Sequence, residues 1–213
     1  MGLRARLLEI PIVYETLQNA VVRPERKSWL PHCLIEAKPG MTVLDVGCGT
    51  GKILTDLPEV TYVGIDHNRD YVAQANYRHG LRGRFLAIDV NNAAFKELGQ
   101  FDRILLIGVL HHLSDEECLH LLPKLHEALA PDGLLVTYDN AIAKGQHPIA
   151  RLLAKLDRGR YARSAARYRA LIEETFAIES ETVRHDLLRV PYTIVAFRAR
   201  RCDSAQSQSS YVE

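Results

Sequence analysis

The amino-acid sequence predicts a single α/β domain whose centre is a mostly parallel β-sheet. From Met41 onward, short apolar runs of strand length alternate with polar stretches that can form helices, and this alternation is the pattern of repeated βαβ units. A glycine-rich turn, Gly47 to Gly51, separates the first apolar run from the next helix-compatible stretch. The length of 213 residues suits one domain of this class, with a substantial core that needs no disulfides.

The alternation places the elements of the central region in order along the chain. We expect strands near residues 42–46, 61–65, 84–88, 102–107 and 133–138. Helices are expected near residues 51–57, 69–78, 92–98 and 115–129. The strands then run in one direction, because each helix returns the chain to the start of the next strand.

The helix at 115–129 carries the clearest signals. Ser114 can cap its first turn, Glu116 and Glu117 complement the positive end of its dipole, and Pro131 with Gly133 ends it. Its buried stripe is expected to consist of Leu119, Leu122, Leu125 and Leu129.

The two ends of the chain complete the pattern. We expect helices near residues 10–20, 26–37, 149–156 and 162–174. Two closing strands are expected near residues 176–183 and 191–198. The segment from Cys202 onward is polar and rich in serine and glutamine, which predicts a disordered tail.

The composition narrows the function. Basic and acidic residues nearly balance, 27 against 26, so the chain lacks the overall charge that drives nonspecific nucleic-acid binding. The four cysteines are scattered and form no CxxC pair, which argues against a zinc site and suits a reducing cytoplasm. No apolar run could span a bilayer, and the first residues lack the apolar core of a signal peptide. We therefore expect a cytoplasmic protein that binds no metal.

The glycine-rich turn is the first candidate for a binding site. Gly47, Gly49 and Gly51 stand at alternate positions, where they allow positive φ angles and let a ligand lie against the backbone and the start of the next helix. Such a turn alone is a weak signal, and two carboxylates sharpen it. Asp45 lies at the end of the first strand, two residues before the first glycine, and Asp66 closes the second strand.

Several segments resemble one family, the class I S-adenosylmethionine-dependent methyltransferases. DVGCGTG at 45–51 resembles the first motif of that family, and VGID at 63–66 resembles the end of its second strand. Three later segments resemble the ends of its third, fourth and fifth strands, namely AID at 87–89, FDRILLIGVLHHL at 101–113 and LAPDGLLVTYD at 129–139. The resemblance implies a Rossmann-like, seven-stranded, mostly parallel sheet with an antiparallel seventh strand, helices on both faces, and S-adenosyl-L-methionine as the cofactor.

The resemblance also implies which residues bind the cofactor at the carboxyl ends of the strands. Gly47 and Gly49 would let the backbone approach the methionine and the ribose, and Asp45 would organise the amino group directly or through water. Asp66 would accept both ribose hydroxyls, because a carboxylate has two oxygens that can take a diol. Asp89 would accept from the adenine amino group, and helix capping by Asp66 or a loop turn at Asp89 is the structural alternative.

Three further residues complete the predicted cofactor site. The N–H of Val90 would donate to an adenine ring nitrogen. His67 and Ile107, beside the second and fourth strand ends, belong to the same predicted set.

Two histidines are the candidates for catalysis. Methyl transfer is an in-line displacement in which positioning and desolvation supply most of the rate. A neutral nitrogen nucleophile needs no strong base, whereas a hydroxyl profits from one. His111 and His112 follow the fourth strand directly and would face the cleft, and a histidine titrates near neutral pH. His112 is the preferred base, and a structural or cofactor-shaping role is the alternative.

The resemblance divides the chain into three parts. Residues 1–38 would form helices over the cofactor site, and 39–201 would form the methyltransferase core with a substrate-lid insertion at about 141–172. Residues 202–213 would be the disordered tail. In the first part, the candidates to touch the cofactor or the substrate are Tyr14, Arg23, Arg26 and Trp29, with ordinary helix packing as the alternative.

A basic stretch follows the fifth strand. Between Lys144 and Arg169 the chain carries many lysines and arginines, with only Asp157 opposing them, together with His147, Tyr161 and Tyr168. It could grip a carboxylate, a phosphate or a nucleotide-linked substrate. A pair of surface helices with solvated arginines is the equally weighted alternative.

These observations favour methyl transfer to a small, anionic metabolite, with oxygen slightly preferred to nitrogen as the acceptor. The alternatives are an RNA or tRNA methyltransferase that uses the basic stretch, and a protein that binds S-adenosylmethionine without catalysis. The chain lacks the Asn/Asp-Pro-Pro-Tyr/Phe motif of nucleic-acid amine methylases after the fourth strand, so a nucleic-acid partner is unlikely. A nicotinamide dehydrogenase is disfavoured by Asp45 and by the antiparallel last strand. We expect a monomer or a homodimer.

Overall fold

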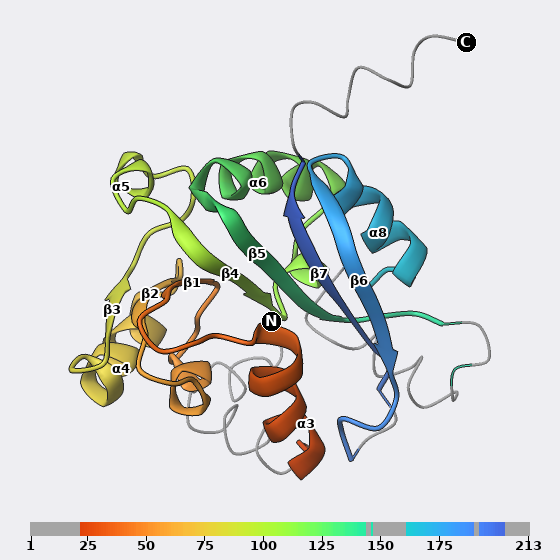
Figure 1. The fold of residues 1–213 in the computed structure, drawn as a ribbon, viewed down its shortest axis with the longest axis horizontal. Helices are drawn as coiled ribbons and strands as arrows, with labels where there is room; N and C mark the ends of the chain where they lie inside the picture. Colours follow the sequence, from red (N-terminus) through yellow and green to blue (C-terminus); the bar gives the residue numbers. More distant parts are fainter. Residues whose placement is uncertain (1–21, 144–145, 147–160, 190–191, 203–213) are drawn as a thin grey trace, which may run out of the picture.

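A single seven-stranded sheet forms the centre of the molecule in a computed structural model (Figure 1). The structure describes residues 22–143, 146, 161–189 and 192–202. The strands are β1 (Thr42–Val46), β2 (Thr61–Ile65), β3 (Gly83–Leu86), β4 (Phe101–Ile107), β5 (Leu129–Asn140), β6 (Phe176–Arg184) and β7 (Ile194–Arg201). All seven correspond to strands expected from the sequence.

The order of the strands is β3-β2-β1-β4-β5-β7-β6. The pairs among β1 to β5 are parallel, and β7 is antiparallel to both of its neighbours, β5 and β6. This confirms the predicted Rossmann-like sheet with an antiparallel seventh strand. The largest boundary differences are at β5, which begins at Leu129 instead of residue 133, and at β7, which spans Ile194–Arg201 instead of 191–198. In addition, β3 ends at Leu86 instead of residue 88.

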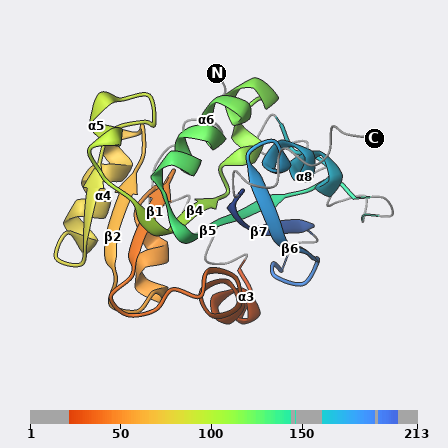
Figure 2. The same cartoon turned by 45° about the horizontal axis from the view of Figure 1, so that its top comes forward.

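Helices cover both faces of the sheet (Figure 2). They are α3 (Pro24–Trp29), the π-helix η1 (Leu30–Ile35), the 3-10 helix η2 (Lys52–Asp56), α4 (Arg69–His79), α5 (Ala93–Lys96), the 3-10 helix η3 (Leu110–His112), α6 (Asp115–Ala128) and α8 (Ala165–Glu173). Figure 2 shows α6 and α8 on one side of the sheet and α3 on the other. The helices expected at 10–20 and 149–156 lie outside the described residues, as does most of the expected tail.

Two apolar clusters fill the spaces between the sheet and these helices. One contains side chains of α5, α6 and α8 against one face of β1, β4, β5 and β7. The other contains side chains of η1, η2 and α4 against the opposite face. In the part of the chain that the structure describes, we find no helix long and apolar enough to cross a membrane.

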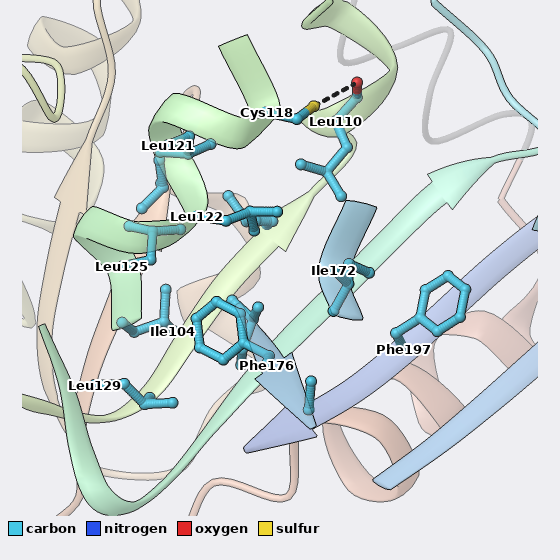
Figure 3. Close-up of a cluster of buried hydrophobic side chains, with 14 of the residues drawn as sticks. Ile104, Leu110, Cys118, Leu121, Leu122, Leu125, Leu129, Ile172, Phe176 and Phe197 are labelled. Carbon is cyan, nitrogen blue, oxygen red and sulfur yellow. Dashed lines mark hydrogen bonds between the residues drawn. The ribbon is translucent and has the colours of Figure 1, made fainter. Parts of the chain in front are cut away.

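The expected signals position α6 well, and Leu122 and Leu125 of the expected stripe are buried, but Leu119 is not. Ser114 and Glu117 form a reciprocal capping box at its start, with the Ser114 N–H 2.7 Å from a carboxylate oxygen of Glu117. The side chains packed on the sheet are Cys118, Leu121, Leu122, Leu125 and Ala128 (Figure 3).

Leu119 was wrongly assigned to that stripe. It is 43% exposed, because the helical repeat that starts at Cys118 turns position 119 away from the sheet. Leu129 is buried as expected, but it belongs to β5 and not to the helix.

This arrangement predicts a contrast between two leucines of α6. Leu122→Ala should lower the free energy of unfolding by about 2–5 kcal/mol, because it leaves a cavity under a fully buried side chain. Leu119→Ala, the matched control, should change it by less than about 1 kcal/mol. Urea titration followed by circular dichroism measures both. Equal losses would show that α6 is rotated relative to this packing.

Candidate functional site

The glycine-rich turn is pressed against the end of β4. Gly47 has a φ of +73°, and a Cβ added there would lie 2.8 Å from Cγ2 of Val109. Gly51 also has a φ of +73°, and its added Cβ would lie 2.6 Å from the ring of Phe85. Both positions therefore require glycine by conformation and by space. The Gly47 N–H donates to the carbonyl of Ile65 at 2.8 Å, which ties the turn to the end of β2.

Asp66, the residue after β2, holds this turn. Its Oδ2 accepts from the N–H of Gly49 at 2.9 Å, and its Oδ1 accepts from the N–H of Asn68 at 2.8 Å. The residue is only 8% exposed. Each carboxylate oxygen has a second lone pair, so both can still accept a hydroxyl. Asp66 is thus fixed in direction and able to take a diol.

A cavity of about 580 Å³ opens beside these two features. Its lining comes from the carboxyl ends of β1, β2 and β4, from the loop after β3 and from the first turns of α6. The lining residues are Val46, Gly47, Ile65, Asp66, His67, Ile88, Asp89, Val90, Asn91, Val109, Leu113, Glu116, Glu117, His120 and Leu121. Parallel α/β sheets place their ligands at this edge.

Five of the eight predicted cofactor-binding residues line this cavity: Gly47, Asp66, His67, Asp89 and Val90. Asp89 is exposed, and its Oδ1 accepts from the N–H of Asn91 at 2.6 Å, so it forms the loop turn that was its structural alternative while also lining the cavity.

The other three lie next to the cavity and are not among its lining residues. Gly49 contributes its N–H to Asp66, and Ile107 is the last residue of β4, packed against the η1 side of the sheet. Asp45 lies in β1 and is 3% exposed. The binding roles of all three remain predictions.

Asp45 is bonded beneath the turn. The hydroxyl of Tyr62 donates to its Oδ2 at 2.5 Å. Burial raises the pKa of Asp45 to about 7, although the bond from Tyr62 opposes this shift. A buried carboxyl that is half protonated near neutral pH costs stability when it ionises.

The two predicted catalytic histidines occupy different environments in η3. His111 is 8% exposed, and its Nδ1 lies 2.8 Å from Oδ1 of Asp139, the second-last residue of β5. His112 is exposed, with its ring centroid 4.1 Å from that of His111. Sequence reasoning missed Asp139. An acidic residue at the carboxyl end of β5, one strand away from the histidines, was the available signal.

The described arginines of the basic stretch are bonded within the protein. Arg163 is 8% exposed and donates to the carbonyls of Leu110 and Leu113 at 2.8 and 2.6 Å. It also donates to Asp115 at 2.7 Å, and Arg167 bonds the same carboxylate. Arg169 pairs with Glu173 and Glu181. These three arginines are therefore paired with groups of the chain itself, which favours the structural alternative for them.

The candidates in the N-terminal part pack against the sheet and the last hairpin. Arg26 donates to the hydroxyl of Tyr138 at 3.1 Å, and the guanidinium of Arg184 lies 5.2 Å from the ring centroid of Trp29. Neither Arg26 nor Trp29 lines the 580 Å³ cavity, which favours the helix-packing alternative for both. Tyr14 lies outside the described residues.

Comparison with known proteins finds a methyltransferase domain. A family model described as a methyltransferase domain matches residues 43–133, which span β1 to the start of β5 and include the cavity lining. The domain and the fold support a class I S-adenosylmethionine-dependent methyltransferase. Enzymes of this class use S-adenosyl-L-methionine, as the sequence motifs predicted.

Among curated relatives, the chain is similar to probable tRNA methyltransferase 9B of Mus musculus, 34% identical over 129 residues. It is also similar to trans-aconitate 2-methyltransferase of Deinococcus radiodurans, 30% identical over 147 residues. The first match covers 59% of this chain and 28% of the mouse protein, and the second covers 67% and 53%. The chain thus spans about half the length of these relatives or less.

Solved structures agree on the fold. The TehB-like S-adenosylmethionine-dependent methyltransferase from Corynebacterium glutamicum superposes with a TM-score of 0.67 over 93% of this chain and 100% of its own, at 18% identity. The pyocyanin biosynthetic protein PhzM gives a TM-score of 0.69 over 94% of this methyltransferase chain and 62% of its own, at 21% identity. At these identities the likeness concerns the fold alone.

The burial of Asp45 predicts a stability difference that depends on pH. Its ordinary pKa of 3.8 is raised to about 7 in the folded state, so its favourable contribution is complete below about pH 4 and is lost as the pH rises through about 7. Asp45→Asn does not titrate. Relative to the wild type, it should therefore gain about 2–4 kcal/mol of stability between pH 4.5 and pH 8, measured by urea unfolding.

Asp186→Asn is the control of opposite sign. Its bonds with Arg184 lower the pKa of the exposed Asp186 to about 2, so the wild-type residue stabilises the fold above its ordinary pKa of 3.8. That variant should become relatively less stable as the pH rises from about 2 to about 4, and its difference should stay level between pH 4.5 and pH 8. A difference for Asp45→Asn that stays constant with pH would contradict the buried, protonated state.

Proposed function

We propose that this methyltransferase transfers a methyl group from S-adenosylmethionine to a small, negatively charged metabolite, with oxygen favoured over nitrogen as the acceptor. One observation carries the proposal. An almost fully buried carboxylate, Asp66, is held by two backbone N–H groups at the wall of a 580 Å³ cavity, beside a turn in which Gly47 has no room for a side chain.

The residues present fit the cofactor. Asp66 would take the ribose diol with the lone pairs that Gly49 and Asn68 leave free. Asp89 and the backbone of Val90 would contact the adenine between the apolar side chains of Ile88 and Leu121, which line the same cavity. When bound, the cofactor supplies an electrophilic methyl group on a positively charged sulfur.

The chain's own contribution is placement and exclusion of water. Val109 and Leu113 line the cavity from the turn after β4, and they present apolar surface toward the bound nucleoside. A dry, rigid site aligns the acceptor atom with the methyl group and spares the reaction the cost of rearranging solvent.

Two observations support a small anionic acceptor. A relative at 30% identity is named for trans-aconitate, which is a tricarboxylate. Residues 144–160 of this chain, which follow β5 in the sequence, carry five lysines and arginines and one acidic residue, Asp157. An acceptor with one or more carboxylates would complement that charge.

The second candidate is a tRNA methyltransferase. The identity of 34% with probable tRNA methyltransferase 9B favours it. The pairing of Arg163, Arg167 and Arg169 with carboxylates of the chain itself favours the small-molecule acceptor, because these arginines are already engaged.

Asp66 provides the test of cofactor binding. Asp66→Ala should weaken S-adenosylhomocysteine binding by about 100-fold or more in isothermal titration calorimetry, because it removes charge-assisted hydrogen bonds and releases the glycine turn. Asp70→Ala is the matched control, since this exposed carboxylate lies outside the cavity lining. Thermal melting confirms that both variants are folded. Affinity of Asp66→Ala within threefold of the wild type would refute the ribose assignment.

Labelled cofactor separates the two acceptor classes. With S-adenosylmethionine that carries tritium in its methyl group, we expect label to enter a small-molecule extract of bacterial cells and not total tRNA. Transfer to tRNA that falls steeply as salt rises from 50 to 200 mM, roughly the range over which phosphate contacts weaken, would establish the tRNA methyltransferase instead.

A further inference from the structure

His111 and Asp139 form a buried pair at the carboxyl ends of β4 and β5. Oδ1 of Asp139 receives two bonds from His111, one from the ring Nδ1 at 2.8 Å and one from the backbone N–H at 3.1 Å. Asp139 is 2% exposed, and its Oδ2 is buried without a hydrogen-bond partner among the residues that the structure describes. In a buried site the negative charge of Asp139 acts strongly on the adjacent His111 ring, because little solvent screens it.

We infer that His111 is the general base of this methyltransferase, that Asp139 positions it, and that the acceptor atom is therefore a hydroxyl oxygen. The inference rests on the methyl transfer proposed above and adds to it the proton-accepting group and the class of acceptor atom.

The pair fixes the tautomer of His111. An ionised carboxylate can only accept, so the ring nitrogen beside Asp139 carries the hydrogen and Nε2 carries the lone pair. The backbone bond to the same oxygen prevents the ring from turning away from Asp139. Nε2 is thus the basic atom of the pair, and its direction is set by two bonds.

The ring lies against the tip of β4. Gly108 has a φ of +76°, and a Cβ added there would lie 3.6 Å from Cε1 of His111, the carbon between the two ring nitrogens. The next residue, Val109, lines the cavity beside Gly47. Its Cγ2 would lie 2.8 Å from a Cβ added at Gly47. His111 is not itself among the lining residues, but it lies two residues after Val109 and two before Leu113, which both line the cavity at the edge of the sheet where α/β folds bind their ligands.

Arg163 secures this turn from outside. Its guanidinium bonds the carbonyls of Leu110 and Leu113, which flank the two histidines, and the N–H of Tyr161 donates to the carbonyl of His111 at 3.1 Å. The charged and titratable groups around the pair are His112 in the same turn, Asp115 and Cys118 on α6, Tyr161 and Arg163 before α8, and Tyr168 on α8. Such a shell holds the imidazole rigidly, as a positioned base requires.

The chemistry of acceptors explains why a base points to a hydroxyl. A carboxylate has already lost its proton at neutral pH, because its pKa lies near 4. A neutral amine attacks through its lone pair and loses its proton afterward. A hydroxyl still holds its proton when it attacks, so only this class gains from a base in place at the moment of transfer.

The proton and the methyl group balance in one step. The acceptor hydroxyl gives its proton to Nε2 of His111, and its oxygen bonds the methyl carbon as the carbon–sulfur bond breaks with its electron pair left on sulfur. The products are a methyl ether and a neutral thioether, with an imidazolium stabilised by Asp139. Nε2 returns the proton to water after the products leave.

Nitrogen NMR of the protein alone tests the pair without turnover. In the wild type at pH 8 we expect His111 as the Nδ1–H tautomer, with the unprotonated shift at Nε2. His126→Gln, the control in the last turn of α6, should leave this pattern unchanged. Asp139→Ala should shift the ring hydrogen toward Nε2, because it removes the acceptor beside Nδ1. An Nε2–H tautomer in the wild type, or no response to Asp139→Ala, would overturn the inference.

Turnover gives the second test, with tritium-labelled S-adenosylmethionine and the metabolite extract as the probe. His111→Gln should lower the initial rate of labelling about 100-fold or more, and His126→Gln, the control in the last turn of α6, by less than about threefold. The wild-type product should be an ether, which keeps its label in mild alkali and does not bind a cation exchanger. Label released as methanol by alkali indicates an ester, and retention on the exchanger indicates an amine; either result would overturn the inference.

The two proposals fail separately. If the wild type binds no S-adenosylhomocysteine or labels nothing, the proposed methyl transfer is wrong. If His111→Gln labels as fast as the wild type, methyl transfer stands and the assignment of the base is wrong.

Discussion

The bond between Asp66 and the N–H of Gly49 is the constraint on which the rest of the site depends. β1 and β2 run parallel in register, with Val46 opposite Ile65, so the residues that follow them emerge at the same edge of the sheet. Asp66 then fixes the glycine turn of β1 to the end of β2, and the turn in turn meets Val109 at the end of β4. The bond from Gly49 to Asp66 and the contact between Gly47 and Val109 therefore hold the ends of β1, β2 and β4 around one cavity.

Most of the fold was predictable from the sequence because its elements carry local signals. β1 and β2 are short apolar runs and were predicted to the residue. The start of α6 could be recognised in the sequence because Ser114 and Glu117 have the spacing of a capping box. Leu119 was misplaced because two adjacent stripes on an amphipathic helix differ by one residue, and only packing against the sheet chooses between them. The end of β3 was misplaced because residues 87 and 88 remain apolar after the strand has ended.

The position of the cavity was also predictable, since the motifs place Gly47, Asp66, Asp89 and Val90 at consecutive strand ends, and their binding roles stay predictions. The surroundings of the two histidines were not predictable. They depend on contacts between residues far apart in the sequence, such as His111 with Asp139 and Arg163 with Leu110. The sequence favoured His112, but nothing local distinguishes two adjacent histidines. Only the fold shows that His111 is buried and hydrogen-bonded to Asp139, whereas His112 is exposed.

The chain leaves the sheet after β5 and returns at almost the same point, because Ala141 and Arg163 form a parallel bridge and the N–H of Ile142 donates to the carbonyl of Arg163 at 2.8 Å. The residues between these two anchors form a cassette whose ends meet on the scaffold. Such a cassette can be exchanged for one of another length or sequence while the sheet and the cofactor cavity stay intact. A graft at this single junction would therefore need to rejoin the chain only at these two anchors.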